Sequence, residues 1–281
     1  TASPLASGHV GTLKFERHGQ HGQPVILIPG LQGGPWVWQD TIADLERHHV
    51  VYAVTLAGFD GMPAPANRSD LMGQASASLL RLIDEQHIER PVLVGHSLGG
   101  TLALRFAGEH PQRIAGVVAV DGLPVFPGLD QVDPAQRQAI AAAGAAKMAN
   151  LDQAQFAAYA ETYMRHVGVI DPALASRYAP LNARSDIAAS AAYAGEVLAA
   201  DYRPGLAAAK LPILELMPFN AADAAASPEL ADEAAKLALY RRLLESAPQA
   251  RVQAIAPTRH YLMLDQPAAF RAALNAFLSH L

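Results

Sequence analysis

The chain has 281 residues, which is enough to bury a large hydrophobic core in one domain with room for an inserted subdomain. Hydrophobic residues make up 51% and charged residues 17% of it, the formal net charge is −5, and no basic stripe occurs, so nucleic acid is not an expected partner. No apolar run approaches the roughly 20 residues that a membrane-spanning helix needs. The absence of cysteine excludes disulfides, thiol catalysis and thiolate metal sites.

The chain begins at Thr1 rather than at a methionine. The opening TASPLASG is typical of a flexible leader, and removal of an export signal would leave such a start. We therefore expect a periplasmic or secreted protein, or a cytoplasmic one if the start has another origin.

Buried strands and amphipathic helices alternate along the first 121 residues. Strands are predicted at residues 14–16, 24–28, 50–56, 91–94 and 114–120, and helices at residues 36–47, 69–86 and 101–110. Such alternation indicates crossover units around a parallel sheet.

The alternation stops after Asp121. Residues 122–205 are alanine-rich and helical in pattern, without a convincing strand, and about 80 residues are too many for a connecting loop. We expect them to form an inserted helical cap over the carboxyl edge of the sheet, on a core made of residues 1–121 and 206–281. Alternation resumes with strands at 212–217 and 251–256 and helices at 228–246 and 267–281.

A sharp turn between a strand and a helix presents Ser97, in the stretch LVGHSLGGTLALRF. In such a turn the side chains two residues before and after the serine would collide, which explains Gly95 and Gly99. The serine backbone would be strained, and a purely structural turn has little reason to hold that strain. We interpret Ser97 as a nucleophile. The alternative is a glycine-rich turn with an anion site at the helix N-terminus.

A serine hydroxyl needs a base, and histidine is the side chain suited to that role near neutral pH. His260 lies in APTRHYLMLDQP, just past the last predicted strand and so at the same sheet edge as Ser97. The alternative is an exposed loop histidine. His96 is expected to pack and hydrogen-bond within the turn. No two histidines and a carboxylate have metal-ligand spacing, so neither a metal nor a cofactor is expected.

An acyl-transfer site must also stabilise an oxyanion, which fixed backbone N–H groups do best. The amide of Leu98, directly after the nucleophile, is one predicted donor. The second is the amide of Leu31, in the loop after the first strongly buried strand. The alternative for this loop is an ordinary turn.

Four motifs together resemble the α/β-hydrolase superfamily. They are the strand and PG loop at residues 28–34, TLAGFDG at 55–61, GHSLGG at 95–100 and RHYLMLDQP at 259–267. The resemblance is greatest to capped bacterial serine hydrolases, many of them esterases. It implies a mostly parallel central sheet with helices on both faces and an inserted helical cap. The first loop begins Pro29-Gly30 where the family usually has His-Gly, which leaves the backbone donor intact.

The triad acid is the hardest residue to place. Most of the family carries it a few residues after the strand that follows the cap, which here falls near Asn220 or Ala221, and Asp223 comes about two residues late. Some members place it instead at the end of the preceding strand, where this chain has Asp121. A strand end holds a carboxylate more rigidly than an alanine-rich loop does, so we favour Asp121 and keep Asp223 as the alternative.

The resemblance implies a serine hydrolase that cleaves a carboxylic ester or related acyl bond of a small molecule through an acyl-enzyme. Hydrolysis of a lactone, amide, thioester or carbon–carbon bond, or acyl transfer, stays open on the same triad. Haloalkane dehalogenases and most epoxide hydrolases are disfavoured because they use an aspartate nucleophile where this chain has Ser97. A non-catalytic ligand-binding receptor is the rival from another class, and the presence of both Ser97 and His260 speaks against it.

Overall fold

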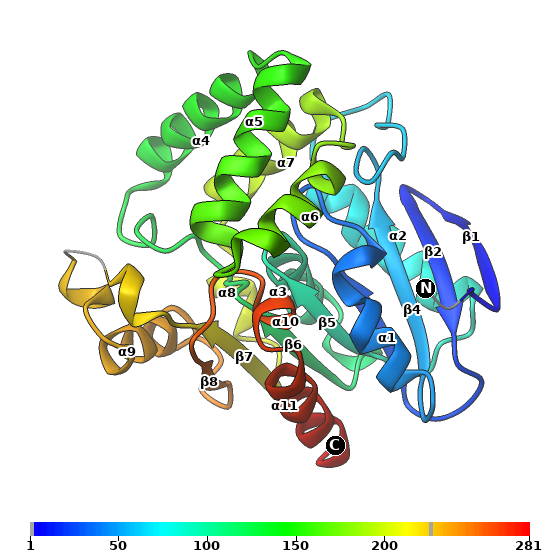
Figure 1. Ribbon diagram of the computed structural model, residues 1–281. Coiled ribbons are helices and arrows are strands. Elements are labelled where there is room, and N and C mark those ends of the chain that lie inside the picture. The colour runs from blue at the N-terminus through cyan, green and yellow to red at the C-terminus, as the bar shows by residue number, and fades with distance from the viewer. Residues whose placement is uncertain (1–2, 225–226) are drawn as a thin grey trace.

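The computed structural model describes residues 3–224 and 227–281, and within them the chain forms an eight-stranded sheet (Figure 1). The strand order is β1-β2-β4-β3-β5-β6-β7-β8, in which β1–β2 and β2–β4 are antiparallel and the other neighbours are parallel. The strands are β1 Ala6–Val10, β2 Leu13–His18, β3 Pro24–Ile28, β4 Val50–Leu56, β5 Val92–His96, β6 Gly116–Val120, β7 Ile213–Pro218 and β8 Arg251–Ile255. The mostly parallel sheet predicted from the sequence is confirmed.

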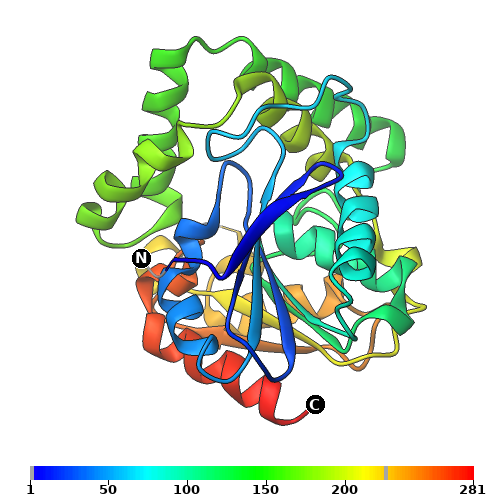
Figure 2. The same cartoon turned by 90° about the vertical axis from the view of Figure 1, so that its right-hand side faces the viewer.

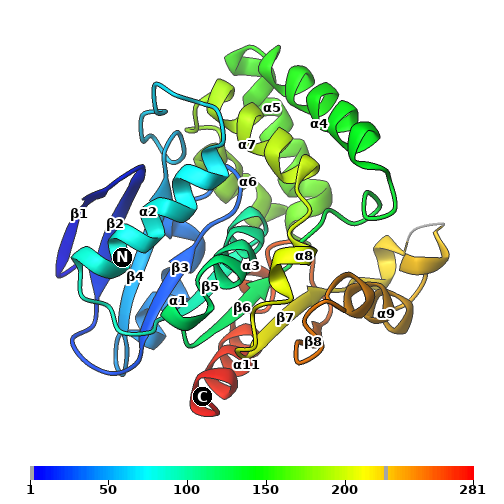
Figure 3. The same cartoon turned by 180° about the vertical axis from the view of Figure 1, so that it is seen from behind.

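Helices cover both faces of the sheet (Figures 1 and 3). Helices α1, α10 and α11 pack on one face, and α2, α3, α8 and α9 pack on the other, each group with its own hydrophobic cluster. Their bounds are α1 Gln39–Leu45, α2 Leu71–Glu85, α3 Leu98–Glu109, α8 Arg203–Leu206, α9 Glu233–Leu243, α10 Leu262–Asp265 and α11 Pro267–Ser279. The central strands β5 and β6 are therefore buried on both sides, which is why β6 is an unbroken apolar run and β5 is apolar up to its last residue, His96.

Residues 122–205 supply four longer helices that stand over the carboxyl end of the parallel strands (Figure 2). They are α4 Pro134–Ala149, α5 Gln153–Tyr163, α6 Pro172–Asn182 and α7 Ile187–Ala199. An aspartate caps the N-terminus of each, its carboxylate accepting a backbone N–H of the first turn: Asp133, Asp152, Asp171 and Asp186. These four N-capping aspartates mark where each helix begins within an alanine-rich sequence.

None of the helices in the described ranges has both the length and the hydropathy that crossing a bilayer requires.

The N-terminal segment differs from the prediction. Ala6–Val10 belongs to β1 rather than to a free leader, and it pairs along Leu13–His18, so β2 is not the edge strand. The sequence pattern for a strand is weak here because β1 is short and lies at the sheet edge, where only Val10 of the strand is buried. Thr1 and Ala2 of the expected leader lie outside the described residues.

Two predicted helices begin three or more residues later than expected, and a proline-led 3₁₀ turn precedes each of them. Pro35–Trp38 precedes α1, and Pro228–Leu230 precedes α9. Proline at the first position favours a helical turn without ensuring that the turn continues as an α-helix. The α-helix α9 starts only after Asp232, whose side chain accepts the N–H of Ala235.

The turn between β5 and α3 is as tight as its glycines indicate. A Cβ on Gly95 would overlap the carbonyl oxygen of Gly99, and a Cβ on Gly99 would overlap the carbonyl oxygen of Ile28. Ser97 has φ 54° and ψ −120°, an unfavourable conformation for a residue with a side chain. The surrounding backbone thus fixes Ser97 at the tip of β5.

Replacing Gly95 with alanine should destabilise the protein by about 2 kcal/mol or more, because the new methyl group meets rigid backbone and forces the turn to move. Urea unfolding measures the loss. Gly205→Ala is the matched control, since a Cβ at Gly205 meets no atom of the described residues within 4 Å. Equal unfolding midpoints for the two variants would contradict the steric account of the turn.

Candidate active site

Three side chains from distant parts of the chain form one line of hydrogen bonds at the carboxyl edge of the sheet. Ser97 follows β5, Asp121 follows β6, and His260 lies in the loop after β8. His260 Nε2 is 2.9 Å from Ser97 Oγ. His260 Nδ1 is 2.5 Å from Asp121 Oδ2. The geometry is that of a nucleophile, a base and a group that orients the base.

The Asp121 carboxylate is held ionised although it is largely buried. Burial alone would raise the pKa of Asp121, but His260, the charge of Lys236 and a hydrogen bond from Tyr240 outweigh it and lower that pKa to about 2. An ionised carboxylate only accepts hydrogen bonds, so His260 carries its proton on Nδ1. The Nε2 lone pair then faces the Ser97 hydroxyl, as a general base requires.

His96 holds the loop that carries His260. Its ring is buried, and its Nε2 donates to the His260 carbonyl oxygen over 2.9 Å. Burial first of all, and then the neighbouring His260, lowers the pKa of His96 to about 3. His96 therefore packs as a neutral ring, and it hydrogen-bonds as the sequence indicated.

Asp223, the alternative acid, pairs with a different partner. Its Oδ2 is 2.7 Å from Arg259 Nε, and its Oδ1 is 2.8 Å from Arg259 Nη2. These hydrogen bonds lower the pKa of Asp223. The structure thus brings Asp121, and not Asp223, to the His260 imidazole.

The loop after β3 lies directly against Ser97. A Cβ on Gly30 would lie 3.0 Å from Ser97 Cβ, so the loop backbone packs against the serine with no space for a side chain at Gly30. Leu98 is the first residue of α3, where backbone N–H groups have no partner within the helix. Leu31, Ser97 and Leu98 line one cavity together, so the two residues predicted to supply oxyanion donors lie beside Ser97.

Two cavities meet at Ser97, one of about 220 Å³ and one of about 250 Å³. Both are lined by a shared set of residues, Ser97, Leu98, Phe126, Tyr163, Val197 and His260. Met148 of α4 and Tyr159 of α5 add apolar surface to the cavity of about 220 Å³. Leu123 and Val125 add it to the cavity of about 250 Å³. Residues 122–205 therefore supply much of the wall around the serine.

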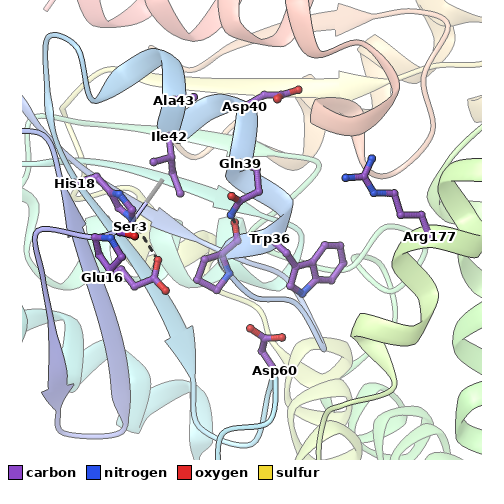
Figure 4. Close-up of a pocket in the computed structure, with 12 residues that line it drawn as sticks. Ser3, Glu16, His18, Trp36, Gln39, Asp40, Ile42, Ala43, Asp60 and Arg177 are labelled. Atoms are coloured by element: carbon purple, nitrogen blue, oxygen red, sulfur yellow. Dashed lines mark hydrogen bonds and ion pairs between the residues drawn. The ribbon is translucent and has the colours of Figure 1, made fainter. Parts of the chain in front are cut away.

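A third cavity, of about 650 Å³, lies away from these residues (Figure 4). Its lining includes the carboxylates of Glu16, Asp40 and Asp60, with Arg177 on its far side. Ser97 and His260 are not part of its wall, so the larger cavity is not the candidate site.

Sequence reasoning missed two residues behind Asp121. Tyr240 of α9 donates its hydroxyl to Asp121 Oδ1 over 2.5 Å, and nothing in its sequence neighbourhood marks it. Glu215 is fully buried in β7, and its Oε2 accepts the Gly122 N–H over 3.2 Å. Burial and the Asp121 charge raise the pKa of Glu215 far above its usual value, so its side chain is a neutral acid. A glutamate inside the apolar strand ILELMP was the available signal.

Comparison with known proteins gives a family match over most of the chain. Residues 25–273 match the model described as the alpha/beta hydrolase family. The enol-lactonase from Burkholderia xenovorans LB400 superposes with a TM-score of 0.77 at 18% identity, covering 98% of this chain and 100% of that one. A thermophilic esterase from Thermogutta terrifontis gives a TM-score of 0.78 at 20% identity, covering 98% and 99%.

Curated relatives match over shorter stretches. Human 1-acylglycerol-3-phosphate O-acyltransferase ABHD5 is 31% identical over 130 residues, which are 44% of this chain and 37% of that protein. A putative carbamate hydrolase, RutD of Yersinia enterocolitica, is 32% identical over 115 residues, 40% of this chain and 41% of that protein. The chain thus matches less than half of the length of these relatives.

The neutral, buried state of His96 predicts a pH-dependent stability. Between pH 6.5 and about 3 the unfolded chain binds a proton on this residue and the folded chain does not, so the free energy of unfolding falls on acidification. From pH 7 to pH 5 His96 should contribute a loss of about 2 kcal/mol that His96→Gln lacks. Urea unfolding of both proteins at the two pH values tests this, and equal losses would contradict it.

Proposed function

Because this chain belongs to the α/β-hydrolase family, we propose that it is a serine hydrolase that cleaves a carboxylic ester or related acyl bond of a small molecule. The observation that carries the proposal is the line of hydrogen bonds from Asp121 through His260 to Ser97. In the proposed triad Ser97 is the nucleophile, His260 the general base and then the general acid, and Asp121 the acid that orients the imidazole.

In the proposed acylation step, His260 Nε2 takes the Ser97 proton as Oγ attacks the substrate carbonyl carbon. The negative charge that develops on the carbonyl oxygen is stabilised by the amides of Leu31 and Leu98, each worth roughly 3 kcal/mol of barrier. Asp121 stabilises the imidazolium formed at His260 without taking its proton. The imidazolium then protonates the leaving alcohol, and an acyl-serine remains.

Water completes the proposed cycle by the same route in reverse. His260 removes a proton from a water molecule that attacks the acyl carbon, and the same two amides stabilise the second oxyanion. Ser97 leaves with the proton that His260 returns to it. The free acid departs, and the site is ready for another substrate.

We further propose that residues 122–205 act as a cap on a core of residues 1–121 and 206–281. Support comes from the cavities at Ser97, whose walls come partly from α4, α5 and α7. Apart from Asp121, His260 and the neutral, buried His96, the described residues of these walls include no ionisable acid or base other than tyrosine. An uncharged substrate of modest size is therefore favoured, because a charged group would lose its hydration without gaining a partner.

Acyl transfer to an alcohol is the second candidate, favoured by the relatives named O-acyltransferases. The two reactions share the acyl-serine and differ only in whether water or another hydroxyl attacks it. Adding glycerol or butanol to an ester assay separates them, since a transferase forms a new ester and a hydrolase forms the acid. A purely binding role is disfavoured by the hydrogen bond between His260 and Ser97, which a receptor does not need.

Replacing Ser97 with alanine should abolish hydrolysis of p-nitrophenyl acetate and butyrate, with a loss on the order of 10⁶ in kcat, because the acyl-enzyme can no longer form. Ser176→Ala is the control, since Ser176 is exposed on α6 and is not part of the cavity walls at Ser97. Full activity of the Ser97 variant would refute the proposed function.

Asparagine substitutions distinguish the two candidate acids. Asp121→Asn should lower kcat on the order of 10⁴, as the corresponding change does in a serine protease, because an amide favours the wrong imidazole tautomer. Asp223→Asn should keep kcat within a few fold, since Asp223 contacts Arg259 rather than His260. Steady-state kinetics on p-nitrophenyl butyrate, with circular dichroism to verify folding, measures both. The reverse ranking would transfer the acid role to Asp223.

A further inference from the structure

The Asp121 carboxylate has two oxygens, and the proposed triad explains only one of them. Oδ2 faces His260, whereas Oδ1 accepts the Tyr240 hydroxyl over 2.5 Å. A distance of this size is typical of a charge-assisted O–H···O⁻ bond. The partner comes from α9, 119 positions along the chain from Asp121.

Tyr240 is built to remain a donor at this place. Its side chain is 4% exposed, and burial, followed by the charge of Asp121, raises the pKa of Tyr240 well above its usual value. The ring packs in the hydrophobic cluster of the α9 face, so the hydroxyl is fixed by packing as well as by its hydrogen bond. A donor so placed leaves Asp121 little freedom to rotate.

Lys236 lies one helical turn before Tyr240 on the same face of α9. Its Nζ donates to the Pro218 carbonyl oxygen over 2.6 Å and lies 5.6 Å from the centre of the Tyr240 ring. The lysine thereby links α9 to the end of β7 and keeps the tyrosine beside Asp121. Helix α9 thus presents both a hydroxyl and a positive charge to the back of the carboxylate.

The backbone also explains why Asp121 needs such a support. Asp121 has φ 50°, in the left-handed region, and its own N–H donates to Leu216 O over 2.9 Å. Glu215, the neutral acid behind it, holds the next amide at Gly122. The main chain is therefore fixed around Asp121, while the direction of its carboxylate is left to Tyr240 and His260.

We propose that Tyr240 is a positioning residue for the reaction, which orients the Asp121 carboxylate so that Oδ2 meets His260 Nδ1; this rests on the proposed triad. The role is to hold one acceptor oxygen so that the other keeps the imidazole in place. Tyr240 donates no proton to the substrate in this scheme, and no bond to it forms or breaks.

The test is Tyr240→Phe, which removes the hydroxyl and keeps the ring. We expect kcat for p-nitrophenyl butyrate to fall about tenfold to a hundredfold, the range known for hydrogen bonds that orient metal-binding side chains, with KM changed less than about threefold. Tyr193→Phe is the matched control. Its ring is equally buried, against Phe59, but its hydroxyl has no hydrogen-bond partner within the described ranges, so wild-type kcat is expected.

A double-mutant cycle separates positioning from general packing. In an Asp121→Ala background, Tyr240→Phe should change the residual kcat less than about twofold, because the group through which Tyr240 acts is gone. The same fall in both backgrounds would overturn the proposal, as would wild-type kcat in Tyr240→Phe itself.

Proton NMR gives a second test that does not depend on the folding of the tyrosine variant. The wild-type protein should show two downfield hydrogen-bonded protons, from Tyr240 Oη and His260 Nδ1, and both should vanish in Asp121→Ala. A single such resonance would overturn the proposal. If Ser97→Ala stays active, the proposed function fails; if Ser97→Ala is inactive and Tyr240→Phe has wild-type kcat, only the role of Tyr240 fails.

Discussion

The hydrogen bond between His260 Nδ1 and Asp121 Oδ2 is the contact on which the rest of the site depends. It joins the end of β6 to the loop after β8, across the intervening strand β7. The carboxylate accepts a hydrogen bond from His260 Nδ1, so the lone pair on Nε2 is directed at Ser97. The Ser97 hydroxyl, which the strained turn after β5 holds in place, therefore has a base within hydrogen-bond distance. Three features keep Ser97, His260 and Asp121 in place: the close packing of the turn, the buried His96 ring and the contacts from α9.

The position of the carboxylate shapes its surroundings. Because Asp121 lies beside His260, the segment after β7 does not have to supply the carboxylate that contacts the imidazole. Asp223 in that segment forms an ion pair with Arg259 instead. Helix α9 follows this segment and brings Tyr240 and Lys236 to the far side of Asp121. Glu215 can stay buried next to an ionised aspartate only as a neutral acid. The charged Asp121 thus follows β6, before residues 122–205, and its supporting contacts come from β7 and α9, after them.

The fold could be predicted where burial sets the residue pattern. Strand β6, and β5 up to His96, are covered on both faces and consist of apolar residues. Gly95 and Gly99 mark the turn because no side chain fits at either position. Strand β1 was missed because an edge strand with one buried residue has hardly any pattern. The sharp turn with Gly95 and Gly99 points to Ser97, and the rule that parallel strands share a carboxyl edge points to His260. Tyr240 could not be found, since only the packing of α9 on the sheet brings it to Asp121.

In the proposed triad, the packing of this turn and the Asp121–His260 pair make Ser97 a nucleophile. Labelling with a fluorophosphonate probe, followed by peptide mapping by mass spectrometry, tests this role of Ser97, because the probe reacts with an activated serine irrespective of the natural substrate. We expect a single adduct on Ser97 in the wild-type protein and none in folded His260→Ala. An unlabelled wild-type protein, or an adduct that persists unchanged in His260→Ala, would contradict it.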